Sequence, residues 1–437
     1  MESTTIHPAR SIQGVVRIPG DKSISHRYAM LAAIAQGTSR FHNFSAARDC
    51  FSTLGCVQEL GAKWRRADGE KEDGAIEVIG LGSRLQAPKA PLDCGNSGST
   101  IRMLSGILAG QPFATELFGD ESLSRRPMAR VIKPLSQMGA KISSNEAGRP
   151  PLTIQGGQLK PIHYKPEVAS AQVKTCLLFA GLFADGETTI EEPIRTRDHG
   201  ELALQAFGAE IERKKSERGS HIVSTRGGQE LTAIEARVPG DLSSAAFFLC
   251  AAALFPGSHI SLPGILMNPT RARLLDILIQ MRLKITVGQI EQHYGELVGS
   301  IEANGATWLG GTISGADTAA LIDEIPVLAA IAPYSENGLE VSDARELRVK
   351  ESDRIAAVAT NLRKMGAELE ERPDGLRIPG RQTLHGAELD SFDDHRIAMA
   401  FAIAALRAEG ETQITNSDSA GVSYPTFFED LSSIADH

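Results

Sequence analysis

An internal duplication constrains the fold of this chain more than any other feature. The segment RIPGDKSISHRYAMLAAIAQG at 17–37 aligns without gaps with RVPGDLSSAAFFLCAAALFPG at 237–257, at a constant offset of 220 residues. One half of the chain is therefore similar to the other, and 437 residues suffice for about two domains. We expect a first domain over 21–240 and a second domain over 1–20 plus 241–437, so that the chain crosses between them near each PGD.

A shorter repeat lies inside the halves, where predicted helices end in a glycine, an alanine and a charged residue. This signature occurs as LGAKW, MGAKI, FGAEI and MGAEL, with MRLKI as a variant. Between these points the hydrophobic period alternates between helical and strand-like values. The pattern predicts about six units of roughly 75 residues, three per domain, in an α/β fold whose sheets are covered by helices. The alternative is that the signature reflects only the common capping of helix ends by glycine.

Composition excludes several classes of partner. The net charge of −9 and the pI near 5.7 argue against a broad nucleic-acid interface, which requires a basic face. The longest apolar run, 245–255, is too short to span a bilayer, and the chain does not start like a signal peptide. Five cysteines without CxxC spacing indicate buried thiols in a reducing compartment. We therefore expect a cytoplasmic protein that binds small molecules, neither nucleic acid nor membrane. We also expect a monomer, although composition does not bear on the oligomeric state.

The helix that follows the first PGD carries charges of the wrong sign. A helix start has unpaired N–H groups and a partial positive charge, which disfavour nearby cations such as Lys22 and Arg27. The second copy of the segment has Leu242 and Phe247 at the equivalent positions, so the fold does not require the charges. A bound anion would reverse the electrostatic cost. We interpret both residues as candidates for anion binding.

The same anomaly recurs at other predicted helix starts. The cations concerned are Arg102, Arg125, Arg126, Lys350, Arg354 and Arg396. A surface salt bridge explains each one equally well by itself, whereas the whole set indicates a single pocket for a polyanion. The GNSGST loop would add backbone N–H groups for oxyanions.

Two acidic residues lie among these cations. Asp323 precedes Pro326 in LIDEIPVLA, and Glu351 lies in RVKESDR. Both are candidates for general acid or base catalysis, although Asp323 could also be a helix N-cap. The DDH sequence at 393–395 has no companion cluster with suitable spacing, so we expect no metal site.

Seven motifs together resemble the 5-enolpyruvylshikimate-3-phosphate synthase family of enolpyruvyl transferases. They are PGDKSISHR, GNSGST, RRPM, SAQVKT, LIDEIPVLA, ELRVKESDR and DDHRIAMA. The resemblance covers nearly the whole chain. It implies two similar domains, each of three βαβαββ units, with an active-site cleft between the domains and no cofactor.

The resemblance also implies a role for individual residues. The contacts it implies for shikimate 3-phosphate are Lys22, Ser23, Arg27, Ser170, Gln172, Asp323 and Lys350. Those for phosphoenolpyruvate are Lys22, Gly98, Arg126, Gln172, Arg354 and Arg396. In the implied reaction the 5-hydroxyl adds to C2 of phosphoenolpyruvate, C3 is protonated, and phosphate then leaves. Asp323 is the candidate base, and Lys22 and Glu351 are both candidates for the proton donor.

Some positions depart from the family pattern, and two alternatives remain. Some members have serine at the position of Ala169 and a lysine in the last segment, which puts a contact from a C-terminal lysine in doubt. A sister enzyme that uses UDP-N-acetylglucosamine typically has a cysteine near GDESLSRRPM and an asparagine after the first lysine, whereas Ser23 follows Lys22 here. A non-catalytic phosphometabolite-binding protein would explain the cations but not Asp323 and Glu351.

Overall fold

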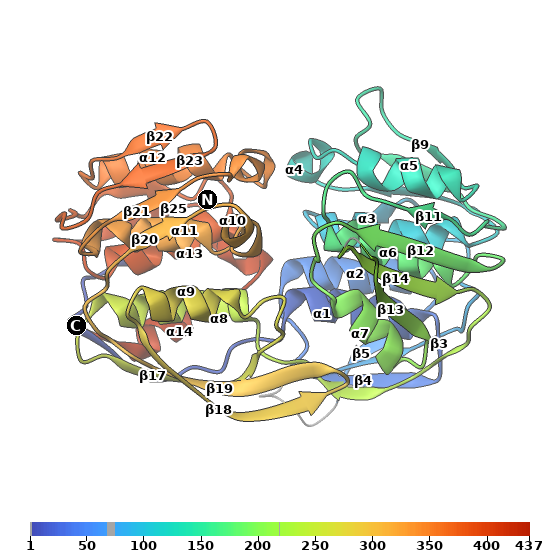
Figure 1. Cartoon of the computed structure of the whole chain (residues 1–437), viewed down its shortest axis with the longest axis horizontal. Coiled ribbons are helices and arrows are strands. Elements are labelled where there is room, and N and C mark those ends of the chain that lie inside the picture. The colour runs from blue at the N-terminus through green and yellow to red at the C-terminus, as the bar shows by residue number, and fades with distance from the viewer. Residues whose placement is uncertain (1, 68–74, 218) are drawn as a thin grey trace. The chain divides into compact units, whose positions relative to one another are not determined.

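The computed structural model describes residues 2–67, 75–217 and 219–437 and divides into two compact units (Figure 1). Unit 1 consists of residues 1–19, 239–291 and 297–437, and unit 2 of residues 20–238 and 292–296. The chain passes from one unit to the other directly before Gly20 and again after Val238. Both crossings therefore lie beside the duplicated PGD sequences.

Unit 2 contains three four-stranded sheets with one pairing scheme. Their strand orders are β16(Glu235–Arg237)-β4(Thr38–His42)-β6(Ile76–Ile79)-β5(Lys63–Arg66), β7(Leu92–Asp93)-β8(Ala114–Phe118)-β10(Leu152–Gln155)-β9(Lys141–Ser143) and β11(His163–Tyr164)-β12(Glu187–Glu192)-β14(His221–Arg226)-β13(Ile211–Lys215). In each sheet the first two strands are parallel and the later pairs are antiparallel. A short parallel pair, β3(Ala35–Gln36) and β15(Leu231–Thr232), is also present.

Unit 1 repeats this scheme with variations at its edges. Its sheets are β18(Lys284–His293)-β19(Glu296–Asn304)-β17(His259–Leu266)-β2(Ser11–Val15)-β26(Ala435–Asp436), β20(Gly311–Ile313)-β21(Leu339–Val341)-β23(Gly375–Ile378)-β22(Glu370–Arg372) and β1(Ser3–Ile6)-β25(Thr412–Thr415)-β24(Glu388–Asp390). Each again joins one parallel pair to antiparallel neighbours. The predicted α/β class, with mixed sheets and helices, is confirmed.

The core of each unit is built on three helices that are buried along almost their whole length. They are α1(Lys22–Ala33), α3(Gly98–Ala109) and α6(Ala171–Gly181) in unit 2, and α8(Leu242–Leu254), α11(Ile325–Ile331) and α13(His395–Ala405) in unit 1. Ala, Gly, Leu and Ile dominate these sequences, which suits helices that pack against neighbours on every side. The polar residues of the buried helices are concentrated at their starts.

More exposed helices cover the sheets, and most of them are followed by the repeated signature. They include α2(Arg48–Glu59), α5(Ala129–Gln137), α7(His199–Ala206), α9(Arg273–Gln280), α12(Arg354–Lys364) and α14(Phe427–Ile434). Four of them are followed by glycines with positive φ, namely Gly61, Gly139, Gly208 and Gly366. The variant MRLKI places Arg282, with φ of 72°, at the same point after α9. The signature is thus both a helix cap and a repeat, because it follows the more exposed helix in five of the six predicted sequence repeats.

Shorter helices complete the chain. They are α4(Glu121–Ser124), α10(Ala316–Ala320) and the 3₁₀ segments Ala332–Tyr334, Arg345–Val349 and Ser417–Val422. No helix in the described part of the chain is long and apolar enough to cross a membrane. All five cysteines are buried and free, and burial raises the pKa of the Cys50, Cys176 and Cys250 thiols.

The hairpin β18–β19 has its strands in unit 1, but its tip, residues 292–296, belongs to unit 2. Glu296 Oε1 lies 2.6 Å from Nδ1 of His199, and both side chains are almost completely buried. The Tyr294 hydroxyl donates a hydrogen bond of 3.0 Å to the carbonyl of Glu235. The tip is therefore an integral part of the packing of unit 2.

Candidate active site

The sequence-predicted residues form one set in each unit. The unit 2 set surrounds the starts of α1, α3 and α6, and the unit 1 set surrounds the starts of α11, α12 and α13.

Lys22 is the first residue of α1. The N-cap is Asp21, whose side chain accepts a hydrogen bond from the backbone N of Ile24. The ammonium of Lys22 lies 2.8 Å from the carboxylate of Asp49 in the first turn of α2. This contact holds the cation at a helix start where the backbone alone would repel it.

Arg27 lies one turn further along α1 and is 3% exposed. Its guanidinium donates 2.8 Å to the carbonyl of Ser23 and 2.9 Å to the hydroxyl of Thr175 in α6. Burial lowers the pKa of Arg27 to about 10, in opposition to the attraction of Glu201. The group therefore remains charged at neutral pH, and an anionic ligand would stabilise it further.

A chain of buried polar side chains ties α1 to α2 and α3. His26 Nδ1 lies 2.7 Å from the Thr53 hydroxyl, which lies 2.7 Å from that of Thr100. Thr100 donates in turn to Ser97, the N-cap of α3. Burial, reinforced by the charges of Lys22 and Arg27, lowers the pKa of His26 well below its usual value. The neutral imidazole is thus a structural link between these helix starts.

Gly98 is the first residue of α3 and leaves room for two guanidinium groups. A Cβ at this position would lie 2.8 Å from NH1 of Arg102 and 3.2 Å from NH1 of Arg126. Arg126 donates 2.7 Å to the Asn96 side chain and 3.1 Å to the Ser122 hydroxyl. The missing side chain therefore allows both cations to approach one stretch of backbone.

Gln172 connects this group to α6. Its amide oxygen accepts 2.9 Å from Arg102, and its amide nitrogen donates 3.0 Å to the Ser99 hydroxyl. Ser170 is the N-cap of α6 and accepts from the backbone N of Val173. The predicted residues Gly98, Arg126 and Gln172 are thus brought together through Arg102.

In unit 1, Asp323 is surrounded by the three predicted cations. Its Oδ1 lies 3.6 Å from Lys350 Nζ and 3.6 Å from Arg354 NH1, and its Oδ2 lies 3.9 Å from Arg396 NH2. Arg396 NH1 also donates 2.7 Å to the backbone carbonyl of Asp323. The N-cap of α11 is Glu324, which makes no side-chain capping bond. The N-cap interpretation of Asp323 is therefore wrong.

Arg354 is 1% exposed and contacts several carboxylates. It donates 2.6 Å to Glu351 and two hydrogen bonds to Asp394. Burial disfavours the charged guanidinium, but Asp394, Glu351 and Asp323 outweigh that cost and raise the pKa of Arg354. This cation is consequently fixed in orientation, with Asp323 and Glu351 held on either side of the same group.

Sequence reasoning missed several residues of these sets. Asp49 and Asp394 hold predicted cations, but they lie 27 and 40 residues away from their partners, and nothing in the sequence links them. Arg197 lies close enough to Arg27 to lower its pKa. It precedes α7, so the rule of cationic helix starts would have found it.

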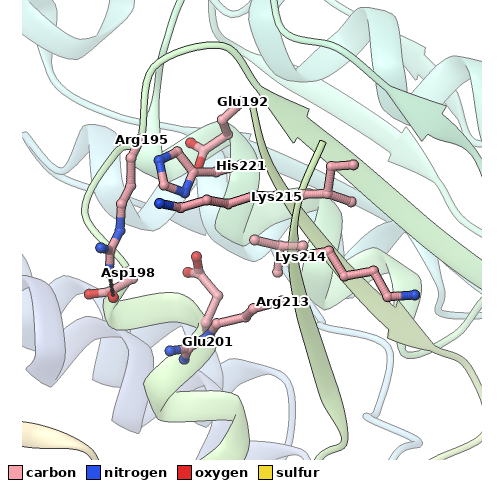
Figure 2. A pocket seen from close by; sticks show the side chains of 10 residues that line it. Glu192, Arg195, Asp198, Glu201, Arg213, Lys214, Lys215 and His221 are labelled. Carbon is pink, nitrogen blue, oxygen red and sulfur yellow. Dashed lines mark hydrogen bonds and ion pairs between the residues drawn. The ribbon is translucent and has the colours of Figure 1, made fainter. Parts of the chain in front are cut away.

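A hollow of about 280 Å³ lies beside the start of α7 (Figure 2). Its lining contains both acidic and basic residues and none of the predicted site residues. Two of its acidic residues, Glu192 and Glu201, each lie 2.8 Å from the buried ammonium of Lys174. Lys174 directly precedes Thr175, which accepts a hydrogen bond from Arg27. The ion cluster around Lys174 therefore helps to fix the part of α6 that contacts Arg27.

The chain is similar to known proteins in both sequence and structure. The model of the family EPSP synthase (3-phosphoshikimate 1-carboxyvinyltransferase) matches residues 6–431. The 3-phosphoshikimate 1-carboxyvinyltransferase of Koribacter versatilis is 58% identical over 436 residues, with both chains fully covered. That of Solibacter usitatus is 55% identical, with 99% of each chain covered. A solved EPSP synthase from Acinetobacter baumannii superimposes with a TM-score of 0.87 at 38% identity, covering 100% of this chain and 98% of that one.

Proposed function

The chain belongs to the EPSP synthase (3-phosphoshikimate 1-carboxyvinyltransferase) family, and we infer that it transfers the enolpyruvyl group of phosphoenolpyruvate to shikimate 3-phosphate. The products are 5-enolpyruvylshikimate 3-phosphate and phosphate, in the pathway to aromatic amino acids. Membership of this family favours shikimate 3-phosphate over UDP-N-acetylglucosamine as the acceptor.

We propose that shikimate 3-phosphate is bound by Lys22, Ser23, Arg27, Ser170, Gln172, Asp323 and Lys350. The buried guanidinium of Arg27 and the ammonium of Lys22 suit a phosphate, because charge-assisted hydrogen bonds are strong where water is excluded. Arg197 would add a further positive charge beside Arg27.

Phosphoenolpyruvate would be bound by Lys22, Gly98, Arg126, Gln172, Arg354 and Arg396. It carries a carboxylate and a phosphate, and the planar guanidinium fork pairs well with both. The space above Gly98, with Arg126 and Arg102 at its edge, supports a small planar ligand at this point.

In the proposed mechanism Asp323 accepts the proton of the 5-hydroxyl while the oxygen of that hydroxyl attacks C2 of phosphoenolpyruvate. A proton is added at C3 by Lys22 or Glu351, which gives a tetrahedral ketal phosphate. Loss of a proton from C3 then accompanies the departure of phosphate and restores the double bond. The neighbouring arginines stabilise the anionic groups without exchanging protons.

The observation that carries this proposal is the position of Asp323 among Lys350, Arg354 and Arg396. A protein that only binds phosphometabolites has no need of a carboxylate in the middle of its cations, since that carboxylate opposes anion binding. A base for the acceptor hydroxyl explains it.

The test is release of inorganic phosphate that depends on both substrates. We expect Lys22→Ala to reduce kcat/KM by roughly a hundredfold or more, as for loss of a charged group acting on the reacting phosphate. Lys133 is an exposed lysine of the same unit that pairs with Glu167, and Lys133→Ala is the matched control. Absence of phosphate release from the unmodified chain would refute the function.

The same proposal includes the setting of the enzyme. We propose that units 1 and 2 are the two domains expected from the duplication and that the reaction requires residues of both. We also propose that the protein is a cytoplasmic monomer; the five free, buried thiols support a reducing compartment. Sedimentation of the purified chain tests the monomer directly.

A further inference from the structure

Glu324 follows the candidate base Asp323 directly in the chain and is 4% exposed. Its Oε1 accepts a hydrogen bond from the hydroxyl of Ser243 in α8 and lies 3.9 Å from NH1 of Arg396. Burial of a carboxylate costs several kcal/mol of hydration, which hydrogen bonds or opposite charges must offset, and this one makes no capping bond to α11. Its position therefore requires a reason other than helix stability.

The hydroxyl of Ser243 is held from its other side. It accepts a hydrogen bond from the guanidinium of Arg271, which is 6% exposed and lies 3.5 Å from Asp241. Asp241 is the N-cap of α8 and accepts 2.8 Å from the backbone N of Ser243. Glu324 is thus the end of a buried chain of polar contacts anchored at the start of α8.

The duplication makes this chain of contacts informative. Ser243 is equivalent to Ser23 at the offset of 220 residues, and Ser23 is a proposed substrate contact in unit 2. In unit 1 the equivalent serine instead supports a carboxylate beside the catalytic candidates. At the start of α8 the serine therefore makes an internal hydrogen bond to Glu324.

We propose that Glu324 is a positioning residue for Arg396, an inference that rests on the function proposed above. The same NH1 atom of Arg396 lies near Glu324 and donates 2.7 Å to the carbonyl of Asp323. A fixed carboxylate and a fixed backbone carbonyl therefore orient this end of the guanidinium. The other terminal nitrogen, NH2, lies 3.9 Å from Oδ2 of Asp323, which is beyond hydrogen-bond distance, so its N–H groups can donate to the anionic groups of phosphoenolpyruvate.

Replacement of Glu324 by glutamine separates the charge from the shape. The amide of Glu324→Gln still accepts from Ser243 and has nearly the same volume, but it no longer attracts Arg396. We expect the KM for phosphoenolpyruvate to rise roughly threefold to tenfold, the range for loss of one partly buried ion pair. The KM for shikimate 3-phosphate and kcat should stay within about twofold, a split that general destabilisation would not produce.

A matched control lies in the same unit. The Ser261 hydroxyl donates 2.6 Å to Glu302 between β17 and β19, away from the unit 1 set. Glu302→Gln should leave all three constants within about twofold. An equal rise in KM for this variant would overturn the proposal.

A double-mutant cycle tests the coupling to Arg396. If Glu324 acts through that residue, its replacement should change KM less than about twofold in an Arg396→Gln background, in which the positive charge is absent. An undiminished effect there would overturn the proposal. Should Glu324→Gln fail to fold, Ser243→Ala takes its place: a raised KM for phosphoenolpyruvate supports the inference and an unchanged one refutes it.

The outcomes for the function and for the inference differ. An unmodified chain that releases no phosphate refutes the proposed function, and the inference falls with it. An active chain whose Glu324→Gln variant has an unchanged KM for phosphoenolpyruvate refutes the positioning role alone.

Discussion

Arg354 and Asp394 are joined by two hydrogen bonds, Nε to Oδ2 at 2.8 Å and NH2 to Oδ1 at 3.2 Å. Both side chains are buried, at 1% and 0% exposure. Asp394 also accepts 3.0 Å from the backbone N of Arg396 and 2.9 Å from Ser352. One carboxylate therefore orients the start of α13 and the central cation of the unit 1 set.

Asp394→Asn should remove about 3–5 kcal/mol from the free energy of unfolding, because it leaves the buried charge of Arg354 without its main partner. Urea denaturation at neutral pH measures the loss. Asp393, the exposed neighbour, supplies the control, and Asp393→Asn should stay within about 0.5 kcal/mol. Equal stabilities of the two variants would contradict this account.

The pH dependence of that difference follows from the pKa of Asp394. Burial alone would raise this pKa, but the charge of Arg354 outweighs it and lowers the value below that of a free aspartate. The unfolded chain therefore binds this proton more readily, and the stabilisation is fully present above the unfolded value of about 3.9. It should shrink as the pH falls from about 4 toward the lower folded-state value, so that the wild-type and Asp394→Asn curves converge in acid.

Gly98→Ala should impair binding without impairing folding. The new methyl group would lie 2.8 Å from Arg102 and 3.2 Å from Arg126, whose flexible ends can move aside. Alanine is also the better helix former, by about 0.5–1 kcal/mol, so thermal stability should be equal or slightly higher. We expect a KM for phosphoenolpyruvate raised roughly tenfold, measured by phosphate release, as for one lost charged contact. An unchanged KM would show that the space above Gly98 is not used by the ligand.

Asp323→Asn tests the proposed base. The amide keeps the shape of the side chain but accepts no proton, so kcat should fall roughly a hundredfold to ten-thousandfold. Single-turnover measurements would show whether the chemical step is the one affected. Asp317 of the same unit, which pairs with Arg273 at 2.6 Å, provides the control substitution Asp317→Asn. A variant of Asp323 with normal kcat would exclude the role of base.

His26 should make the chain less stable as the pH falls below neutrality. Its folded-state pKa lies well below 6.5, so the unfolded chain binds more protons in this range and stability decreases with decreasing pH. The contribution is about 1.4 kcal/mol per pH unit below about 6.5. We expect His26→Gln to show a correspondingly smaller slope of unfolding free energy between pH 6.5 and 5. Equal slopes would indicate that the imidazole can be protonated in the folded chain.

Local rules predicted much of the architecture. The glycine signature marks the ends of α2, α5, α7 and α12 because a left-handed residue after a helix is a local requirement. The variant MRLKI lacks the glycine, yet Arg282 adopts the same left-handed conformation after α9. The cations at helix starts could be detected from the sequence because the helix dipole disfavours a positive charge at any helix N-terminus, whatever the helix packs against.

Tertiary contacts explain what the sequence could not predict. Lys22 with Asp49 and Arg354 with Asp394 are pairs that depend on how separate helices pack. Glu324 was hidden because a glutamate before a helix is expected at the surface, and only the fold shows Ser243 beside it. Sequence patterns thus indicated which groups are unusual, whereas their partners required coordinates.

The hairpin β18–β19 limits how this protein can be divided. Glu296, the partner of the buried His199, comes from the hairpin tip, so a fragment ending at Val238 would lack it. Expression of residues 20–238 alone would leave a hole where residues 292–296 pack and a histidine without its carboxylate. Fusion partners, circular permutations and split-protein designs should therefore keep the hairpin with both halves, because the chain passes between its two units four times.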